Sequence, residues 1–375
     1  MKGTCLFARR MVRMRFWKIL IYGLIMASML LLTGCGGGQG MLDSIEGAKV
    51  GVSMPTQSLQ RWNQDGANLE ERLRGKDLDV DVEFADYDTK KQISHIDHMI
   101  DRGCKVIIIG AVDGNALSSV LSKAKDAGAA VIAYDRLIMN TDAVSYYATF
   151  DNYSVGKMQA QHIVDRLGLI EGKGPFHIEI ATGPLDDHNV QYLFDGAMEV
   201  LRHYIDNGQL VIRSGQITRE QCATPLWNDA RAQERMGDIL AANYKDTHLD
   251  AVLCSNDSVA IGVLAALKEN GYGTAGKVMP ILTGQDADLP NVKAIVAKEQ
   301  SMSVFKDTRA LADVAVKMTE AILRKKTPMV NNIEDYDNGV KIVPTYILEA
   351  QFVDLSNYKK LLIDSGYYTA ASVQQ

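Results

Sequence analysis

The sequence predicts an α/β fold made of two doubly wound, mainly parallel sheets, with a hinge and a cleft between the two domains. Apolar runs of strand length alternate with segments whose apolar residues recur at helical spacing, and this alternation starts near residue 47 and again near residue 175. No low-complexity segment separates the two series, so we expect the domains to be joined closely. The length of 375 residues suits two such domains.

The chain opens with an export signal. A basic segment precedes an apolar run at 19–32, a pattern typical of a secretory signal peptide. The run is shorter than the ~20 residues that a transmembrane helix needs, which argues against a membrane span. The ending LTGC (32–35) resembles the lipobox of bacterial lipoproteins. By that resemblance residues 1–34 are removed and Cys35 becomes the lipidated first residue, followed by a tether at 35–45.

Charge and composition exclude several classes of protein. The formal net charge is −6, and it is more negative without the signal peptide, whose charged residues are all basic. Nucleic-acid binding depends on neutralising phosphates, so we expect no nucleic-acid partner. Cys104, Cys222 and Cys254 lack metal-ligand spacing and are predicted to be small buried residues, although a Cys222–Cys254 disulfide stays open in an exported protein. We expect neither a metal nor a cofactor.

Each half consists of strands that are followed by helices. Apolar runs bounded by turn residues predict buried strands, and apolar residues at helical spacing predict the helices between them. In the first half, strands are predicted at 49–54, 80–85, 105–112, 129–135 and 144–151, with helices at 58–74, 89–103, 115–128 and 154–168. In the second half, strands are predicted at 175–182, 210–217, 250–255 and 278–286, with helices at 189–204, 227–243, 259–271 and 289–300.

Polar and aromatic residues gather where the predicted strands end. Open α/β sheets bind ligands at the carboxyl ends of their strands, and two such edges that face each other form a cleft. The residues that follow predicted strands come from both halves; they are Arg61, Trp62, Asp113, Asn115, Asp135, Arg136, Asp151, Asp187, Asn189, Trp227, Asn256, Asp257, Gln285 and Asp286.

The composition of this cleft suits a sugar. A sugar offers apolar C–H faces, on which aromatic rings can pack, and a rim of hydroxyl groups. Charged groups form the stronger hydrogen bonds to hydroxyls, roughly 1.5–3 kcal/mol each. Arginine only donates and aspartate only accepts, so alternating them lets one hydroxyl donate and accept at once. Asp135 and Arg136 are adjacent at the end of a predicted strand, and they form either a local ion pair, a solvated loop or a pair of charged groups aimed at a ligand.

Several segments resemble the class I periplasmic sugar-binding proteins, close to the xylose-binding and multiple-sugar-binding (galactose/glucose) branch. The resemblance covers nearly all of 46–350, and its most specific parts are "YDR" within 131–138 and "GQDAD" within 282–289. The other matching segments are 51–66, 92–117, 150–156 and 254–262.

The resemblance implies roles for individual residues. Trp62 and Trp227 are expected to stack near the sugar. Those expected to hydrogen-bond it are Arg61, Asp135, Arg136, Asp187, Asn189, Asn256, Asp286 and Lys306.

The resemblance also implies a division of the chain into two α/β lobes. In this family the chain crosses between lobes three times, here predicted near 149–152, 300–303 and 327–332. The first lobe is then 46–149 plus 303–328, and the second is 150–302 plus 329–365.

The function implied is that of a binding protein, not an enzyme. It captures a monosaccharide of the xylose, glucose or galactose type by hinge closure and delivers it to an ABC permease. It is exported, lipid-anchored to the outer face of the bacterial cell membrane or in the periplasm, and a monomer. The sequence contains no HExxH, G-x-S-x-G or P-loop motif to support catalysis. A sugar-sensing lipoprotein that signals to a membrane receptor shares every one of these features and is the alternative.

Overall fold

The computed structural model describes residues 44–374. The predicted signal peptide and the predicted lipidation site at Cys35 lie outside the described residues. From Gly47 onward the chain forms one compact unit. This unit contains two parallel sheets with their helices, which we call the first and the second lobe. The α/β fold with mainly parallel sheets is thereby confirmed.

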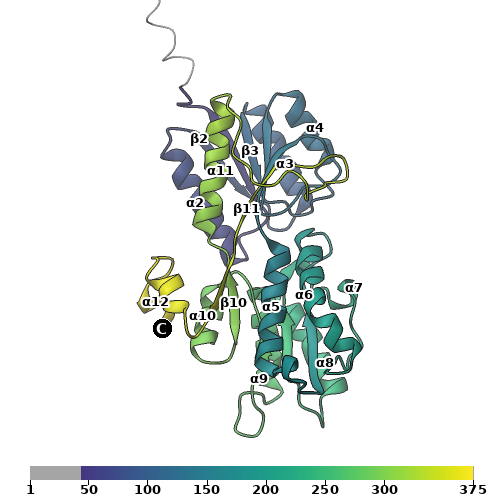
Figure 1. Cartoon of the computed structure of the whole chain (residues 1–375). Helices are drawn as coiled ribbons and strands as arrows, with labels where there is room; N and C mark the ends of the chain where they lie inside the picture. The colour runs from purple at the N-terminus through teal and green to yellow at the C-terminus, as the bar shows by residue number, and fades with distance from the viewer. Residues whose placement is uncertain (1–43, 375) are drawn as a thin grey trace, which may run out of the picture. The chain divides into compact units, whose positions relative to one another are not determined.

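The first lobe is built on a six-stranded sheet in the order β11-β5-β4-β3-β1-β2, in which every neighbouring pair is parallel. Its strands are β1 (Lys49–Met54), β2 (Asp79–Phe84), β3 (Val106–Ile109), β4 (Ala130–Tyr134), β5 (Val144–Phe150) and β11 (Thr345–Leu348). Its helices are α2 (Gln60–Arg74), α3 (Thr89–Asp101), α4 (Ser118–Asp126) and α11 (Thr308–Leu323), and α2 lies beside α11 (Figure 1).

Helices cover both faces of this sheet because its central strands are apolar on both sides. All four residues of β3 are buried. Ile107 and Ile109 pack into a cluster with Ile96 of α3 and Leu121 of α4. Successive side chains of a strand point to opposite faces of the sheet. The other two residues of β3 therefore point to the opposite face, which α2 and α11 cover.

The second lobe has a four-stranded parallel sheet in the order β7-β6-β8-β9. Its strands are β6 (Phe176–Ala181), β7 (Leu210–Val211), β8 (Ala251–Cys254) and β9 (Ile281–Leu282), and its helices are α5 (Asn152–Leu167), α6 (Asn189–Asp206), α8 (Asp229–Asn243), α9 (Asp257–Glu269) and α10 (Leu289–Val296). Beside it, β10 (Met302–Phe305) pairs antiparallel with β12 (Gln351–Asp354). The amide of Val304 donates to the carbonyl of Gly284 at 3.0 Å, which attaches this pair to the strand end of β9.

Helices α5 and α6 pack closely because glycines meet backbone at their contact. A Cβ built on Gly156 of α5 would lie 2.0 Å from the carbonyl oxygen of Leu193, and one on Gly196 of α6 would lie 2.1 Å from that of Tyr153. Any side chain at either position would push the two helices apart. This contact fixes the start of α6, which carries Asn189.

The strand pairing corrects two of the predicted crossings. Strand β10 pairs with β12 in the second lobe and α11 packs on the first sheet, so the chain crosses after Phe305 rather than at 300–303. Strand β11 pairs with β5 in the first sheet, so the last crossing lies between Leu348 and Gln351 rather than at 327–332. The resemblance placed residues 329–348 in the second lobe, but the pairing of β11 with β5 puts them in the first lobe.

The three described cysteines are buried thiols. Cys222 and Cys254 belong to different apolar clusters, and the thiol of Cys222 donates to the carbonyl of Gln216 at 3.3 Å. The disulfide between them, left open by the sequence, is therefore not formed. Burial raises the pKa of the Cys222 thiol to about 11, so it stays protonated and unreactive at neutral pH.

Within residues 44–374, no helix is long and apolar enough to cross a membrane. Over the same residues, no group of three or more histidine, cysteine, aspartate or glutamate side chains is arranged to hold a metal ion.

We predict that His162 makes the protein less stable in acid. Burial within α5, helped by Arg166, lowers the pKa of His162 to about 4, and its Nε2 has no hydrogen-bond partner. A histidine whose folded pKa is depressed binds protons better when unfolded, so stability falls as pH drops from about 6.5 towards 4. In urea titrations at several pH values, His162→Leu should lose less stability over this window than the wild type. The same change at exposed His248 should leave the profile unaltered; equal profiles for both variants would contradict the prediction.

Candidate functional site

A small cavity lies between the ends of the strands of both lobes. Its residues come from the first lobe, the second lobe and the crossing between them; they are Leu59, Arg61, Trp62, Asp135, Arg136, Asn152, Asp187, Asn189, Leu193, Trp227, Asn256, Gln285 and Lys306. Its volume of about 20 Å³ is room for about one water molecule. The structure thus brings together nine of the ten predicted ligand-binding residues. The tenth, Asp286, does not line the cavity, but it lies 3.2 Å from Lys306 and 3.6 Å from Arg61, which do.

Arg61 is the centre of the first of two ion-pair clusters. Its guanidinium contacts Asp65 at 3.0 Å, one turn further along α2, and Asp135 at 3.1 Å, at the end of β4. It also lies 3.6 Å from Asp286, which follows β9 in the second lobe. Lys306, at the end of β10, approaches the same two carboxylates, at 3.2 Å from Asp286 and 3.8 Å from Asp135. All five side chains are buried.

Arg136 is the centre of the second ion-pair cluster, and its pair with Asp187 joins the two lobes. Its Nε lies 2.9 Å from the carboxylate of Asp187, which follows β6, and its Nη1 donates to the carbonyl of Ala111 at 3.0 Å. The indole Nε1 of Trp227 donates to the same Asp187 carboxylate at 3.2 Å. Asp135 and Arg136 therefore take different partners. The local ion pair that their adjacency suggested is not formed, because their side chains diverge from a turn, although Arg136 still helps to lower the pKa of Asp135.

That turn has an unusual backbone. Asp135 has a φ of 62°, in the left-handed region that non-glycine residues seldom occupy. Its carbonyl accepts three hydrogen bonds, from Tyr147 Oη at 2.7 Å, Thr149 Oγ1 at 3.0 Å and Asn189 Nδ2 at 2.8 Å. Asn189 belongs to the second lobe, so this carbonyl is a further link between the lobes.

Two other site residues have the same backbone strain. Asp286 has a φ of 96° and Trp227 a φ of 54°. Strain of this kind costs of order 1–3 kcal/mol per residue and persists where the surroundings hold the residue firmly. Gly183 shows how firmly Trp227 is held, because a Cβ there would lie 2.3 Å from the indole ring.

The charges of the site act on one another. Burial alone raises the pKa of Asp135, but Arg61, Lys306 and Arg136 outweigh it and bring the pKa below its ordinary value. Asp135 is therefore ionised at neutral pH and available as a hydrogen-bond acceptor. Burial raises the pKa of Asp65 to about 6, although Arg61 and the hydroxyl of Tyr134 oppose this shift.

Trp62 forms part of the cavity wall between two cations. The guanidinium of Arg61 lies 4.4 Å from its ring centroid and that of Arg136 lies 5.2 Å away. Both distances suit cation–π attraction, which helps to position the guanidinium groups. The ring Nε1 is buried and has no hydrogen-bond partner.

Some site residues were missed from the sequence. Asp65 supports Arg61 from the next helical turn, and an Arg–x–x–x–Asp spacing could have indicated it. Asn152 lines the cavity, although the sequence placed it only between a predicted strand and a predicted helix, and the apolar side chains of Leu59 and Leu193 form part of the wall. The buried Oδ1 of Asn152 and Oε1 of Gln285 have no hydrogen-bond partner, which leaves both free to accept from a ligand.

Other strand-end residues have structural roles. Asp151 caps α5 by accepting from the amide of Ser154, and Asp113 accepts from that of Asn115. Asp257 lies beneath the site and accepts from Ser303 and Gln300. Asn256 has two roles, since it lines the cavity and its Oδ1 caps α9 by accepting from Val259.

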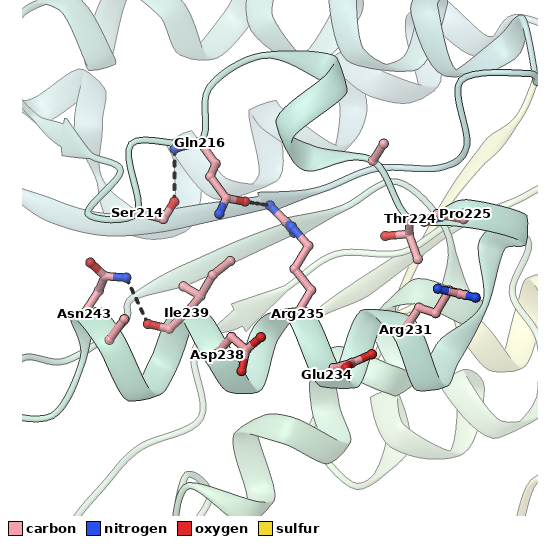
Figure 2. A pocket seen from close by; sticks show the side chains of 12 residues that line it. Ser214, Gln216, Thr224, Pro225, Arg231, Glu234, Arg235, Asp238, Ile239 and Asn243 are labelled. Atoms are coloured by element: carbon pink, nitrogen blue, oxygen red, sulfur yellow. Dashed lines mark hydrogen bonds between the residues drawn. The ribbon is translucent and has the colours of Figure 1, made fainter.

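A larger hollow of about 450 Å³ lies elsewhere, along α8 of the second lobe (Figure 2). Arg235 crosses it to bond Gln216 and the carbonyl of Ile180. It contains none of the predicted site residues and is lined by the second lobe alone. We therefore place the functional site at the smaller cavity, where buried charges of both lobes meet.

We predict that Arg61→Met destabilises the fold strongly. The change removes the close cation of Asp65 and leaves Asp135 and Asp286 with Lys306, and breaking a buried pair costs about 3–5 kcal/mol. The loss should shrink towards acid pH, where the carboxyls become neutral. The free energy of unfolding in urea measures it.

Arg74→Met is the matched control for that experiment. Arg74 pairs with Glu70 on the same helix at the same spacing, but both side chains are about half exposed. Its removal should cost about 1 kcal/mol or less. If the two variants lost similar free energy of unfolding, the buried Arg61 cluster would contribute no more stability than an exposed ion pair.

Comparisons with known proteins agree on the family. Residues 50–327 match the model of the periplasmic binding protein domain. The chain is 50% identical over 321 residues to a multiple sugar-binding periplasmic receptor of Rhizobium radiobacter, covering 86% of this chain and 91% of that protein. It is 32% identical to the D-xylose-binding periplasmic protein of Escherichia coli, with 85% and 91% covered.

Solved structures give the same result. An ABC transporter solute-binding protein from Clostridium phytofermentans with bound β-D-glucose superposes with a TM-score of 0.84 at 51% identity, covering 87% of this chain and 99% of the other. A carbohydrate transporter solute-binding protein from Chloroflexus aurantiacus, in complex with D-glucose, gives a TM-score of 0.78 at 32% identity, with 86% and 97% covered. The chain belongs to the periplasmic binding proteins, a family of non-enzymatic receptors, in the branch of the multiple-sugar-binding and xylose-binding proteins.

Proposed function

We propose that this protein captures a monosaccharide of the glucose, galactose or xylose type in the cavity between its lobes. One observation carries the proposal: buried charged side chains from both lobes converge on a single cavity. The bound β-D-glucose and D-glucose of the two related structures support this ligand class. The ten residues predicted from the sequence are the proposed contacts, joined by Asn152 and Gln285.

The proposed recognition relies on alternating donors and acceptors. Asp135 and Asp286 accept hydrogen bonds from sugar hydroxyls, while Arg61, Arg136 and Lys306 donate to them. A hydroxyl can donate to a carboxylate and accept from a cation at once, which an aliphatic or purely anionic ligand cannot do. Trp62 and Trp227 offer apolar ring surface for the C–H faces of the sugar.

Binding requires the lobes to move apart, because a cavity of about 20 Å³ does not admit a sugar ring. The pairs Arg136–Asp187 and Arg61–Asp286 connect the two lobes and must loosen when the cleft opens. A ligand that contacts both lobes favours the closed arrangement through its differential affinity. Three short crossings, after Phe150, Phe305 and Leu348, form the proposed hinge.

The protein is proposed to act outside the cytoplasmic membrane, tethered by a lipid on Cys35. The LTGC sequence at 32–35 supports this placement. Tethering raises the effective concentration of the closed, sugar-loaded form near its membrane partner. That partner is proposed to be an ABC permease, since the related solved proteins are described as ABC transporter solute-binding proteins. The receptor is proposed to be a monomer.

A calorimetric titration of residues 36–375 with aldoses tests the proposed ligand class. We expect saturable binding of glucose, galactose or xylose, and no binding of an anionic sugar phosphate, whose charge would meet the carboxylates of Asp135 and Asp286. A thermal-shift screen complements it, because a ligand at 100 times its Kd adds about 2.7 kcal/mol of stability. Binding of none of these aldoses would overturn the proposal.

We predict that Asp286→Ala weakens sugar binding by about 10- to 100-fold. The substitution removes a charged acceptor and leaves Lys306 without its nearest carboxylate, and a charged hydrogen bond contributes about 1.5–3 kcal/mol. Asp313→Ala, which removes an exposed ion pair with Lys317 on α11, is the control and should bind as the wild type does. A Kd for Asp286→Ala within twofold of the wild type would remove Asp286 from the site.

We predict that Cys35→Ser abolishes lipid attachment. In cells that process lipoproteins, the wild type should incorporate labelled fatty acid and sediment with membranes, while the variant should not. Cys104→Ser is the control, because Cys104 is a buried thiol within the fold. A variant that still incorporates lipid would contradict the assignment of Cys35.

A further inference from the structure

The chain beyond β12 returns to the boundary between the lobes. After β12 come a helical turn, η3 (Lys359–Ile363), and a short helix, α12 (Ala370–Gln374). This segment packs on the second lobe. Leu362 and Val373 join Val292 of α10 and Phe305 of β10 in one apolar cluster, and α12 lies beside α10 (Figure 1).

Between these two elements, Tyr368 reaches across to the first lobe. Its hydroxyl accepts a hydrogen bond from Nε2 of Gln60 at 2.6 Å and donates to the carbonyl of Ala287 at 2.9 Å. Gln60 is the first residue of α2 in the first lobe, and Ala287 follows β9 in the second. The Oε1 of Gln60 also accepts from the backbone amide of Leu289 at 3.1 Å. Both polar atoms of the Gln60 side chain are therefore hydrogen-bonded to the second lobe or to the segment that follows β12.

Both partners of Tyr368 are chain neighbours of proposed sugar contacts. Gln60 precedes Arg61, and Ala287 follows Asp286. Arg61 and Asp286 are themselves 3.6 Å apart across the cleft. The hydroxyl of Tyr368 thus joins the side chain of Gln60 to the backbone of Ala287, next to the residues that present these two charged side chains.

Tyr367 makes a parallel link. Its hydroxyl donates to Oε1 of Gln64, one turn after Gln60 on α2, at 2.9 Å, and lies 3.2 Å from Oγ1 of Thr308 at the start of α11. Its ring stacks edge-on against Phe305 at 4.7 Å and lies 4.9 Å from the Arg309 guanidinium. Phe305 and Thr308 flank the second crossing between the lobes, so Tyr367 is held at the hinge itself.

We propose that the Tyr367–Tyr368 pair is a clasp that stabilises the closed arrangement and so raises sugar affinity without touching the sugar. The pair is anchored in the second lobe by its apolar cluster and binds α2 of the first lobe through hydroxyl groups. Opening the cleft separates Gln60 from Tyr368 and Ala287, and it breaks the hydrogen bond between Gln60 and Tyr368. Tyr368 is a positioning residue, and the inference rests on the proposed function for its effect on affinity.

The test is Tyr368→Phe, which keeps the ring and removes the hydroxyl. We expect the Kd for the preferred aldose to rise about 2- to 10-fold, mainly through faster dissociation, because the closed form loses the hydrogen bond from Gln60 that crosses the cleft. Small-angle scattering of the sugar-free protein should show a larger radius of gyration for the variant. Gln60→Met, which removes the other partner, should give the same two changes, and the double variant should add little to either.

Tyr272→Phe is the matched control. The hydroxyl of Tyr272 accepts from the amide of Leu249 at 3.1 Å entirely within the second lobe. This variant should lose stability while keeping the wild-type Kd and radius of gyration. An unchanged Kd and radius for Tyr368→Phe would overturn the clasp. If the wild type bound no aldose, the proposed function would fail, while the scattering comparison would still decide the clasp.

Discussion

The burial of seven charged side chains at the junction of the lobes is the constraint on which the rest of the site depends. Removing an ion from water costs several kcal/mol even after relaxation, and it is offset only where partners and hydrogen bonds are well placed. Arg61, Arg136 and Lys306 face the carboxylates of Asp65, Asp135, Asp187 and Asp286. The sheets, crossings and caps around them place each charge within reach of an opposite one.

The backbone strain at the site has the same origin. Asp135, Trp227 and Asp286 occupy positive φ, and each side chain takes part in an ion pair or hydrogen bond at the junction of the lobes. In a regular continuation of β4, the side chain of Asp135 would point to the face opposite to that of Tyr134, whose hydroxyl donates to Asp65 beside Arg61. The three donors on the Asp135 carbonyl, from both lobes, stabilise the strained turn. The site is therefore preorganised by the fold around it.

The sequence predicted the α/β architecture because strand and helix patterns have different periods, and every parallel strand from β1 to β9 falls within or beside a predicted run. It predicted the cavity residues because carboxyl ends of parallel strands meet at one edge. It did not predict the last crossings, since β10 and β11 are four-residue strands whose partners are distant in sequence.

The sequence also did not indicate which side chains would pair with each other. Adjacent charges such as Asp135 and Arg136 suggested a local pair, but φ at Asp135 turns them apart towards Arg61 and Asp187. Contacts between segments more than 200 residues apart, such as Gln60 with Tyr368, leave no local pattern. Periodicity reports which face of an element is buried, and it does not report which distant residue covers that face.

The charged side chains of the cavity pair with one another, and this pairing limits which ligands the site can bind. In the closed arrangement its cations and carboxylates already satisfy one another, so a ligand gains only where it replaces an ion pair by hydrogen bonds of equal or greater strength. A polyhydroxyl ligand can insert between Arg136 and Asp187 or between Lys306 and Asp286 and bond both partners at once. An apolar ligand would separate the charges and leave both unpaired, at a cost of several kcal/mol. We therefore expect the arrangement that holds the lobes together also to disfavour molecules that lack a dense set of hydroxyl groups.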